Sequence, residues 1–209
     1  MSKTKQESIQ GMSGLSDEDT FILKITKAVA DTLETKINQK LDAILEKFHI
    51  YEAQIKEANQ HIDVLTKKCD QLEQYSRRNN LRVYGIPETK DEDTNLLVCQ
   101  LIKEKLNVTV YPEDIDRSHR VGREISNSTR PILVKFIAYY KKSEVFNNKK
   151  LFKKTPYSVS EDLTKMRYDM LKAAKTKFGK SHVWTSDGRI MWLSNGQRKS
   201  GECISELSK

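Results

Sequence analysis

The sequence predicts an α+β protein in three parts: an N-terminal coiled coil, a ferredoxin-like βαββαβ domain and a small helix-plus-hairpin C-terminal domain. Three observations carry this prediction. Apolar residues repeat in alternating steps of three and four over 41–72, helix and strand patterns alternate over 81–160, and an Asp-Gly pair separates two strand-like segments further on. The expected boundaries are 1–15 for a disordered leader, 16–76 for the helix and coiled coil, 77–160 for the βαββαβ domain and 161–209 for the C-terminal domain.

The predicted helix begins at Ser16, because Ser16 and Asp19 resemble a capping box. Further along it, five heptads contain no Gly or Pro, and their apolar positions are Leu41, Ile44, Phe48, Tyr51, Ile55, Ala58, Ile62, Leu65, Cys69 and Leu72. A seam of period 3.5 must meet a copy of itself or another helix, so these residues form the predicted oligomerisation surface. Over residues 22–37 the apolar residues are mostly four positions apart, so the heptad register shifts near Leu41.

Charges beside the seam favour parallel association. With Leu41 as position a, Lys47 and Glu52 form one pair of opposite charge between copies, and Lys68 and Glu73 form another. The apolar residues at positions a and d leave open whether the coil is a dimer or a trimer. The alternative is an ordinary amphipathic helix that packs on its own domain, and five heptads are long for that.

Residues 81–160 alternate between strand and helix patterns. Apolar alternation and turn residues predict strands at 81–86, 115–121, 131–137 and 157–160, and helices starting near 91–93 and spanning 141–151. This order is the ferredoxin-like arrangement of RNA-recognition-motif (RRM) domains, although the same fold also supports unrelated functions.

The last part of the chain predicts one helix and one hairpin. Ser160 is expected to cap a helix over 162–178. Strands at 183–185 and 190–193 flank Asp187-Gly188, a pair typical of tight hairpin turns. Of the aromatic side chains here, Trp192 is expected in the core, and Trp184 and Tyr168 could be either core or base-stacking residues.

The net charge changes sign along the chain. Residues 1–75 hold 10 Lys and no Arg against 13 acidic residues, a net charge of −3, and residues 76–209 hold 27 basic against 16 acidic residues, a net charge of +11. A basic segment of this kind is typical of polyanion binders, because neutralising phosphates releases counterions. A solvated basic surface is the alternative, and it explains the asymmetry poorly.

Several other classes of protein are not expected. Cys69, Cys99 and Cys203 are widely spaced and no secretory signal precedes them, which indicates an intracellular, reduced protein. No segment approaches the roughly 20 apolar residues that cross a membrane. The four His residues lack metal-ligand spacing, and no Walker A, G-x-S-x-G or paired-carboxylate pattern occurs. We therefore expect no catalytic residue, metal or cofactor.

Five motifs, in this order, resemble the first-reading-frame protein of LINE-type retrotransposons: YSRRNNLRVYGIP (75–87), DIDRSHRVGR (114–123), RPILVKF (130–136), SVSEDLT (158–164) and FGKSHVWTSDGRIMWL (178–193). The last motif is also similar to the C-terminal domain of the baculovirus few-polyhedra proteins. The resemblance implies a homotrimer that coats single-stranded RNA and acts as a nucleic-acid chaperone during retrotransposition. It further implies a location in cytoplasmic ribonucleoprotein particles, with the nucleus as a second possibility.

Basic residues in the second half are the candidate contacts to single-stranded RNA or DNA: Arg77, Arg78, Arg82, Arg117, Arg120, Arg123, Arg130, Lys135, Lys149, Lys150, Arg167 and Arg189. Arginines are favoured because a guanidinium binds phosphate through two parallel hydrogen bonds. Lys149 and Lys150 rank as secondary contacts, since a solvated helix face explains them equally well. Arg167 is included on the resemblance alone, and the alternative is an exposed helix residue.

The sequence departs from an RNA-recognition domain at the stacking positions. Leu133 and Arg82 stand where that domain usually has strand aromatics, so arginine contact is favoured over base stacking on the sheet. A different function class also fits the chain, namely a coiled-coil adaptor whose globular part binds proteins.

Overall fold

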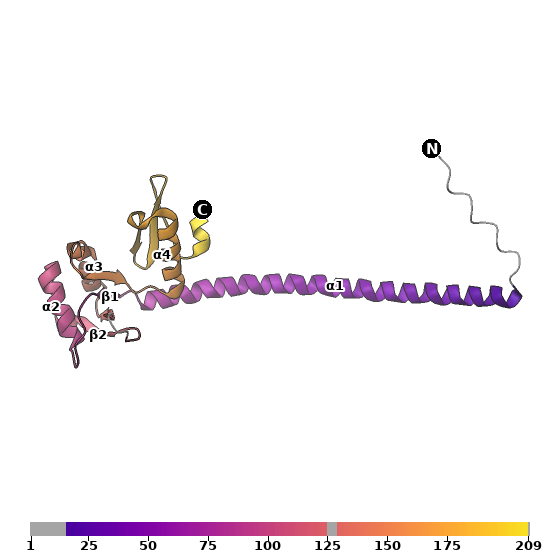
Figure 1. Cartoon of the computed structure of the whole chain (residues 1–209), viewed down its shortest axis with the longest axis horizontal. Coiled ribbons are helices and arrows are strands. Elements are labelled where there is room, and N and C mark those ends of the chain that lie inside the picture. The colour runs from indigo at the N-terminus through magenta and orange to yellow at the C-terminus, as the bar shows by residue number, and fades with distance from the viewer. Residues whose placement is uncertain (1–15, 125–128, 209) are drawn as a thin grey trace. The chain divides into compact units, whose positions relative to one another are not determined.

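The computed structural model describes residues 16–124 and 129–208, and it divides into two compact units, residues 1–64 and 65–209 (Figure 1). Helices and sheets both occur, which confirms the expected α+β class. The expected leader, residues 1–15, and residues 125–128 lie outside the described residues.

Helix α1 runs from Asp17 to Ser76, so it forms the described part of the first unit and the beginning of the second. The Ser16 hydroxyl accepts the Asp19 backbone N–H at 3.2 Å, and the Asp19 carboxylate accepts the Ser16 backbone N–H at 3.2 Å. These reciprocal bonds confirm the predicted capping box, since each satisfies a donor that the first helical turn leaves without a partner.

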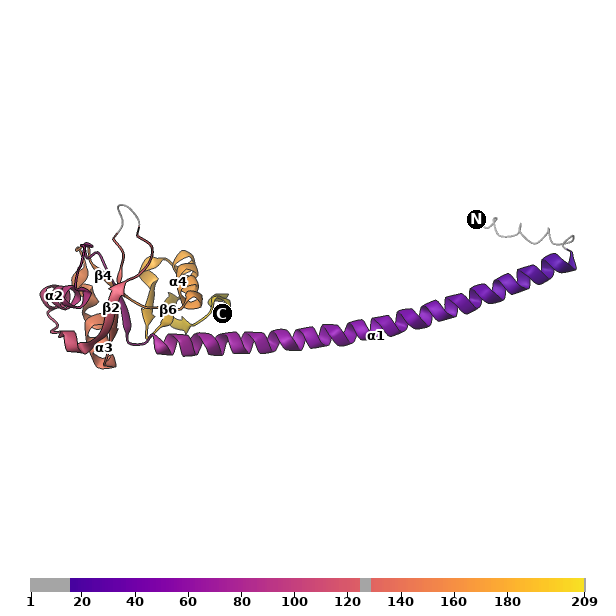
Figure 2. The same cartoon turned by 90° about the horizontal axis from the view of Figure 1, so that it is seen from below.

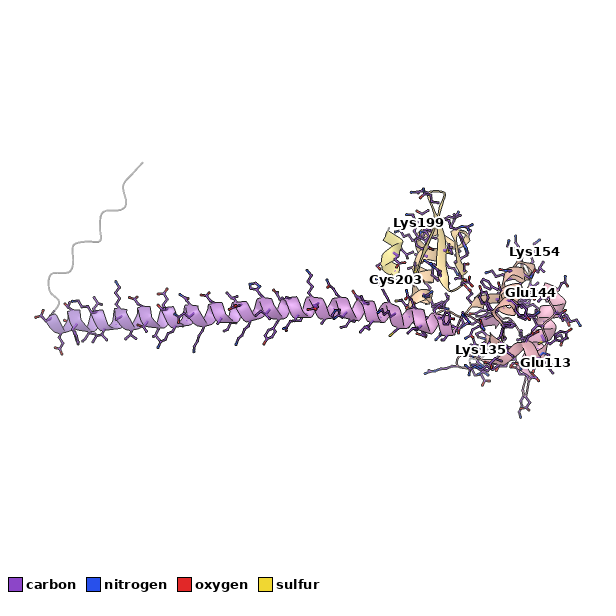
Figure 3. The ribbon with its side chains drawn as sticks, turned by 180° about the vertical axis from the view of Figure 1, so that it is seen from behind. Glu113, Lys135, Glu144, Lys154, Lys199 and Cys203 are labelled. Atoms are coloured by element: carbon purple, nitrogen blue, oxygen red, sulfur yellow. The ribbon has the colours of Figure 1, made fainter. Side chains whose placement is uncertain are left out.

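The apolar seam of α1 is uncovered. Every side chain over residues 17–69 is exposed, including Ile55 at 61% and Leu65 at 59%. Figure 3 shows these side chains projecting around the helix. No described residue of the same chain buries the seam, so a single copy leaves it in water.

The second unit contains a four-stranded antiparallel sheet with strand order β2-β3-β1-β4. Its elements follow the predicted order: β1 (Asn80–Tyr84), α2 (Thr94–Leu106), β2 (Ile115–Arg120), β3 (Ile132–Phe136), α3 (Tyr139–Asn147) and β4 (Ser158–Glu161). The 3-10 helices Pro112–Asp114 and Asn148–Phe152 lie between them, and the second takes over the end of the helix expected at 141–151.

Alternate residues of the central strands are buried under the two helices. Leu81 and Val83 of β1 and Val134 of β3 are 0–1% exposed, and Ile102 of α2 and Val145 of α3 pack in the same core. Since side chains alternate across a strand, the other half of the strand residues lies on the opposite face of the sheet. That face is less buried, and it carries the candidate interface described below.

A second sheet and a second core form the C-terminal part. Helix α4 (Lys165–Phe178) packs against the sheet β5-β6-β7, and both are visible in Figure 2. Its strands are β5 (Val183–Ser186), β6 (Arg189–Ser194) and β7 (Gln197–Gly201), with the 3-10 helices Lys180–His182 and Ile204–Ser208 at either end. Trp192 is 2% exposed and lies in this core, which confirms its expected place.

The structure corrects two details of the C-terminal part. Helix α4 begins at Lys165 with Thr164 as its cap, and Ser160 lies in β4 because that strand pairs with β1 as far as Glu161. Strand β7 was not predicted, although Asn195-Gly196 before it is a strong hairpin signal.

Candidate nucleic-acid interface

The face of the four-stranded sheet opposite α2 and α3 gathers basic and aromatic side chains. Residues that pair directly in antiparallel strands lie on the same face, and Arg117 pairs with Lys135 while His119 and Arg82 both pair with Leu133. We call this surface the open sheet face; it comprises Arg117, His119, Leu133, Lys135, Arg82, Tyr84, Ser158 and Ser160. Figure 3 labels Lys135 on it.

The open sheet face brings together three predicted contacts and two aromatic rings. Arg82, Arg117 and Lys135 come from three different strands. Leu133 occupies the middle of the face, as expected, but Tyr84 and His119 also lie there. Counting in steps of two along each strand from Arg82 and Arg117 finds both rings, because side chains alternate between faces.

The three cations differ in how far the protein itself neutralises them. Arg117 is exposed, and no described residue forms an ion pair or hydrogen bond with its side chain. The ammonium of Lys135 lies 3.0 Å from the Asp116 carboxylate, in a pair exposed enough that solvent screens most of its attraction. Arg82 donates from Nε to the buried Asp162 carboxylate at 2.7 Å. Arg117 is therefore the cation most available to a phosphate.

Arg120 lies on the other side of β2, and its side chain is 6% exposed. Its guanidinium donates to both Glu92 oxygens, at 2.7 and 2.9 Å, and to the carbonyls of Ile86, Pro87 and Arg130. All five N–H groups have acceptors, so none remains for a phosphate. The structure thus corrects the prediction for Arg120: strand parity turns this side chain toward α2 and away from Arg117.

The Arg120 side chain also sets the charge state of its partner. Its hydrogen bonds hold the pKa of the Glu92 carboxyl below the ordinary value, against the opposing effect of burial. Glu88, which like Glu92 lies between β1 and α2, forms an ion pair with Arg130, and this contact lowers the pKa of the Glu88 carboxyl as well. Arg123 is exposed at the end of the described segment.

Arg167 is 3% exposed, so the alternative of an exposed helix residue is wrong, and the side chain offers little surface to a ligand. Its Nε donates to the Asp70 carboxylate at 2.8 Å, and its Nη1 donates to the Gly188 carbonyl at 3.1 Å. One turn after Asp70, the Gln74 amide donates to the Asp162 carbonyl and accepts the Thr164 N–H, both at 3.0 Å. The end of α1 is thus joined to the start of α4.

A second set of contacts, partly buried, joins the two globular parts at the β5–β6 turn. The Lys142 ammonium lies 2.8 Å from the Glu161 carboxylate, with both side chains 3% exposed. Glu161 also accepts the backbone N–H of Gly188 at 3.2 Å, and the Tyr139 hydroxyl donates to Asp187 at 2.5 Å. A Cβ on Gly188 would lie 2.7 Å from the Gln74 side chain, so this turn needs glycine for space as well as for its φ of 76°.

The remaining predicted contacts are spread over the second unit. Arg77 pairs with Glu73 at 2.6 Å and with Asp162 at 3.3 Å, whereas Arg78 is exposed and its guanidinium lies 4.3 Å from the centre of the Tyr75 ring. The Lys149 ammonium lies 3.3 Å from the centre of the Phe146 ring, and burial lowers its pKa. Lys150 and Arg189 are both exposed.

The described segments contain no group of three or more His, Cys, Asp or Glu side chains placed to hold a metal ion. Among the helices of residues 16–124 and 129–208, none is long and apolar enough to cross a membrane. A scan against protein-family models and a search of the curated proteins find no match to this chain.

Proposed function

We propose that this chain is a non-enzymatic protein that self-associates through α1 and binds single-stranded RNA or DNA with residues 77–209. We further propose that residues 77–160 form an RRM-type domain and that the protein acts as a nucleic-acid chaperone in a retroelement ribonucleoprotein. The observation that carries the binding proposal is the open sheet face. There, Arg117 and Lys135 share one face of the sheet with Tyr84 and His119, and α2 and α3 pack on the other face.

The chemistry of the open sheet face suits a single strand. Unstacked bases pack on aromatic rings, while guanidinium and ammonium groups bind the phosphates between them. The strand order β2-β3-β1-β4, with α2 and α3 on the other face, supports the RRM-type assignment. The retroelement role rests on the five motifs that resemble the LINE-type proteins.

The contacts of α1 support self-association. Asp70 and Gln74, which bind the C-terminal part, occupy heptad positions b and f when Leu41 is position a. Leu65 and Leu72, at position d, remain 59% and 71% exposed. Positions b and f lie away from the a and d seam, so a copy of α1 can cover the seam without displacing the C-terminal part.

The proposed binding is tested by fluorescence anisotropy with a labelled single-stranded RNA of about 20 nucleotides, a length above the site size of one typical single-strand-binding domain. We expect log K to fall linearly with log salt, with a slope of about −0.7 for each phosphate contact. The double variant Arg117→Ala, Lys135→Ala is expected to weaken binding and to reduce that slope. The charge-matched control is Lys153→Ala, Lys154→Ala, which removes two exposed cations elsewhere in the domain. Binding that is absent or independent of salt contradicts the proposal and favours the adaptor alternative.

Self-association is tested separately by the mass in solution. We expect the full chain to be a dimer or trimer, and we expect Ile55→Asn, Ile62→Asn to shift it toward the monomer because both side chains lie on the seam. A monomeric wild-type chain at micromolar concentration contradicts the coiled-coil part of the proposal.

A further inference from the structure

The C-terminal sheet has one face against α4 and one face away from it. Val183, Ile190 and Trp192 are buried on the α4 side. Direct pairing places Trp184 beside Met191, and Leu193 beside Arg198, on the opposite side of the sheet. Arg189 lies on that side too, because side chains alternate along β6. We call this the outer C-terminal face; it comprises Trp184, Met191, Leu193, Arg189 and Arg198.

The two tryptophans of the chain therefore lie in contrasting environments. Trp192 is 2% exposed and stacks on Phe178, with 5.9 Å between ring centres. Trp184 is only partly buried, and the guanidinium of Arg198 lies 5.5 Å from the centre of its ring. Trp184 thus does not fill the core, and its ring is bordered by a cation on the same face.

The charge of the outer C-terminal face is uniformly positive. Strands β5, β6 and β7 contain no Asp or Glu, while Arg189 and Arg198 are both exposed. The nearest carboxylate to Arg189 is Glu202, which follows β7 and lies 3.8 Å away in a long contact. Two guanidinium groups on the same face as a partly exposed indole match an anion that also has flat aromatic groups.

We propose that the outer C-terminal face is a second contact surface for a single strand, with a nucleobase stacked on Trp184 and the adjacent phosphates bound by Arg189 and Arg198. Every base has a π face, so such stacking tolerates any sequence. Met191 and Leu193 extend the apolar surface beside the ring. This inference rests on the proposed nucleic-acid binding but uses a surface separate from the open sheet face.

Tryptophan fluorescence provides a direct test, because the chain has only these two tryptophans and one is buried. The probe is an unlabelled uridine RNA of about 20 nucleotides, which is longer than a typical single-domain site. We expect it to quench the wild-type emission, and we expect Trp184→Phe to abolish the quenching while keeping an affinity within about threefold, since the phenyl ring still stacks.

Affinity measurements complete the test. Loss of one base-stacking ring by alanine substitution typically weakens binding about 5- to 150-fold, so we expect Trp184→Ala to fall in that range. Arg198→Ala is expected to reduce the salt slope by about one contact. The matched control is Tyr168→Ala on α4, an exposed ring that also has a cation near it, Lys172 at 4.6 Å. It is expected to leave affinity unchanged.

The outcomes separate this inference from the proposed function. If the wild-type chain binds the RNA with unchanged tryptophan emission and Trp184→Ala binds as tightly, the outer C-terminal face is not a contact surface and the inference is wrong. If the wild-type chain does not bind at all, both proposals fail. Trp184→Phe keeps the test decisive if Trp184→Ala proves unfolded by circular dichroism. Quenching by an acidic peptide but not by RNA would assign the surface to a protein partner instead.

Discussion

The contrast between Arg117 and Arg120 gives the sharpest prediction, because both are arginines of β2 but lie on opposite faces of the sheet. Arg120→Met keeps most of the length of the side chain and removes the guanidinium. It leaves the Glu92 carboxylate, whose side chain is 10% exposed, without its partner, and it leaves the carbonyls of Ile86, Pro87 and Arg130 without one donor each.

The expected cost follows from this burial. Removing one member of a buried ion pair typically destabilises a protein by about 3–5 kcal/mol, because the other charge remains buried and uncompensated. Since both side chains of the Arg120–Glu92 pair are at most 10% exposed, solvent screening reduces this cost little. Arg117→Met changes an exposed side chain, so we expect a change in stability of about 0.5 kcal/mol or less.

Hydrogen exchange is the suitable assay, since both tryptophans lie in the C-terminal part and α1 dominates the circular dichroism. For Arg120→Met we expect the free energy of opening of amides in β1, β2 and β3 to fall by about 3–5 kcal/mol. For Arg117→Met we expect protection to stay unchanged and RNA affinity to fall.

In the double variant Arg120→Met, Glu92→Leu, part of the lost protection should return, because no charge is then left buried without a partner. If Arg120→Met instead keeps full protection and loses RNA binding, Arg120 is a phosphate contact and its structural role here is wrong.

Three further predictions concern titration and thiols. The pKa of Glu92 is lowered in the folded state, so the ionised carboxylate stabilises the fold fully above its ordinary pKa of 4.5. This stabilisation is lost as the pH falls through the lowered pKa, so in Glu92→Gln the free energy of unfolding should depend less on pH in acid. Burial raises the pKa of Cys99 to about 11, so at pH 8 a disulfide reagent should spare Cys99 in the native chain and modify it after unfolding. In a parallel coil Cys69 meets its copies at position a, so mild oxidation should give a disulfide-linked dimer on a non-reducing gel, whereas an antiparallel coil should give none.

Much of the architecture could be predicted because it depends on neighbours along the chain. The Ser16–Asp19 capping box spans three residues, and the heptad seam and the strand alternation are short-range periodicities. The Asp187-Gly188 turn adopts the positive φ values, 50° and 76°, that its residue types favour. These features require no knowledge of what packs against them.

The candidate site was predicted less completely, because a basic residue in a motif does not reveal which face its strand presents. Arg117 and Arg120 are three residues apart in β2, so their side chains lie on opposite faces of the sheet. Only the packing of β2 against α2 decides which of them is buried. The start of α4 was likewise set by the pairing of β4 with β1, which extends the strand to Glu161.

Tertiary structure alone decided the role of Arg167. Its carboxylate partner, Asp70, lies 97 residues earlier in a different helix, and no local pattern connects the two. In an isolated α4 this guanidinium would be exposed to water. The sequence by itself thus determined the apolar seam and most of the helices and strands, because their causes are local periodicities. Packing determined the start of α4, and it determined which cations are neutralised by the protein and which remain for a ligand.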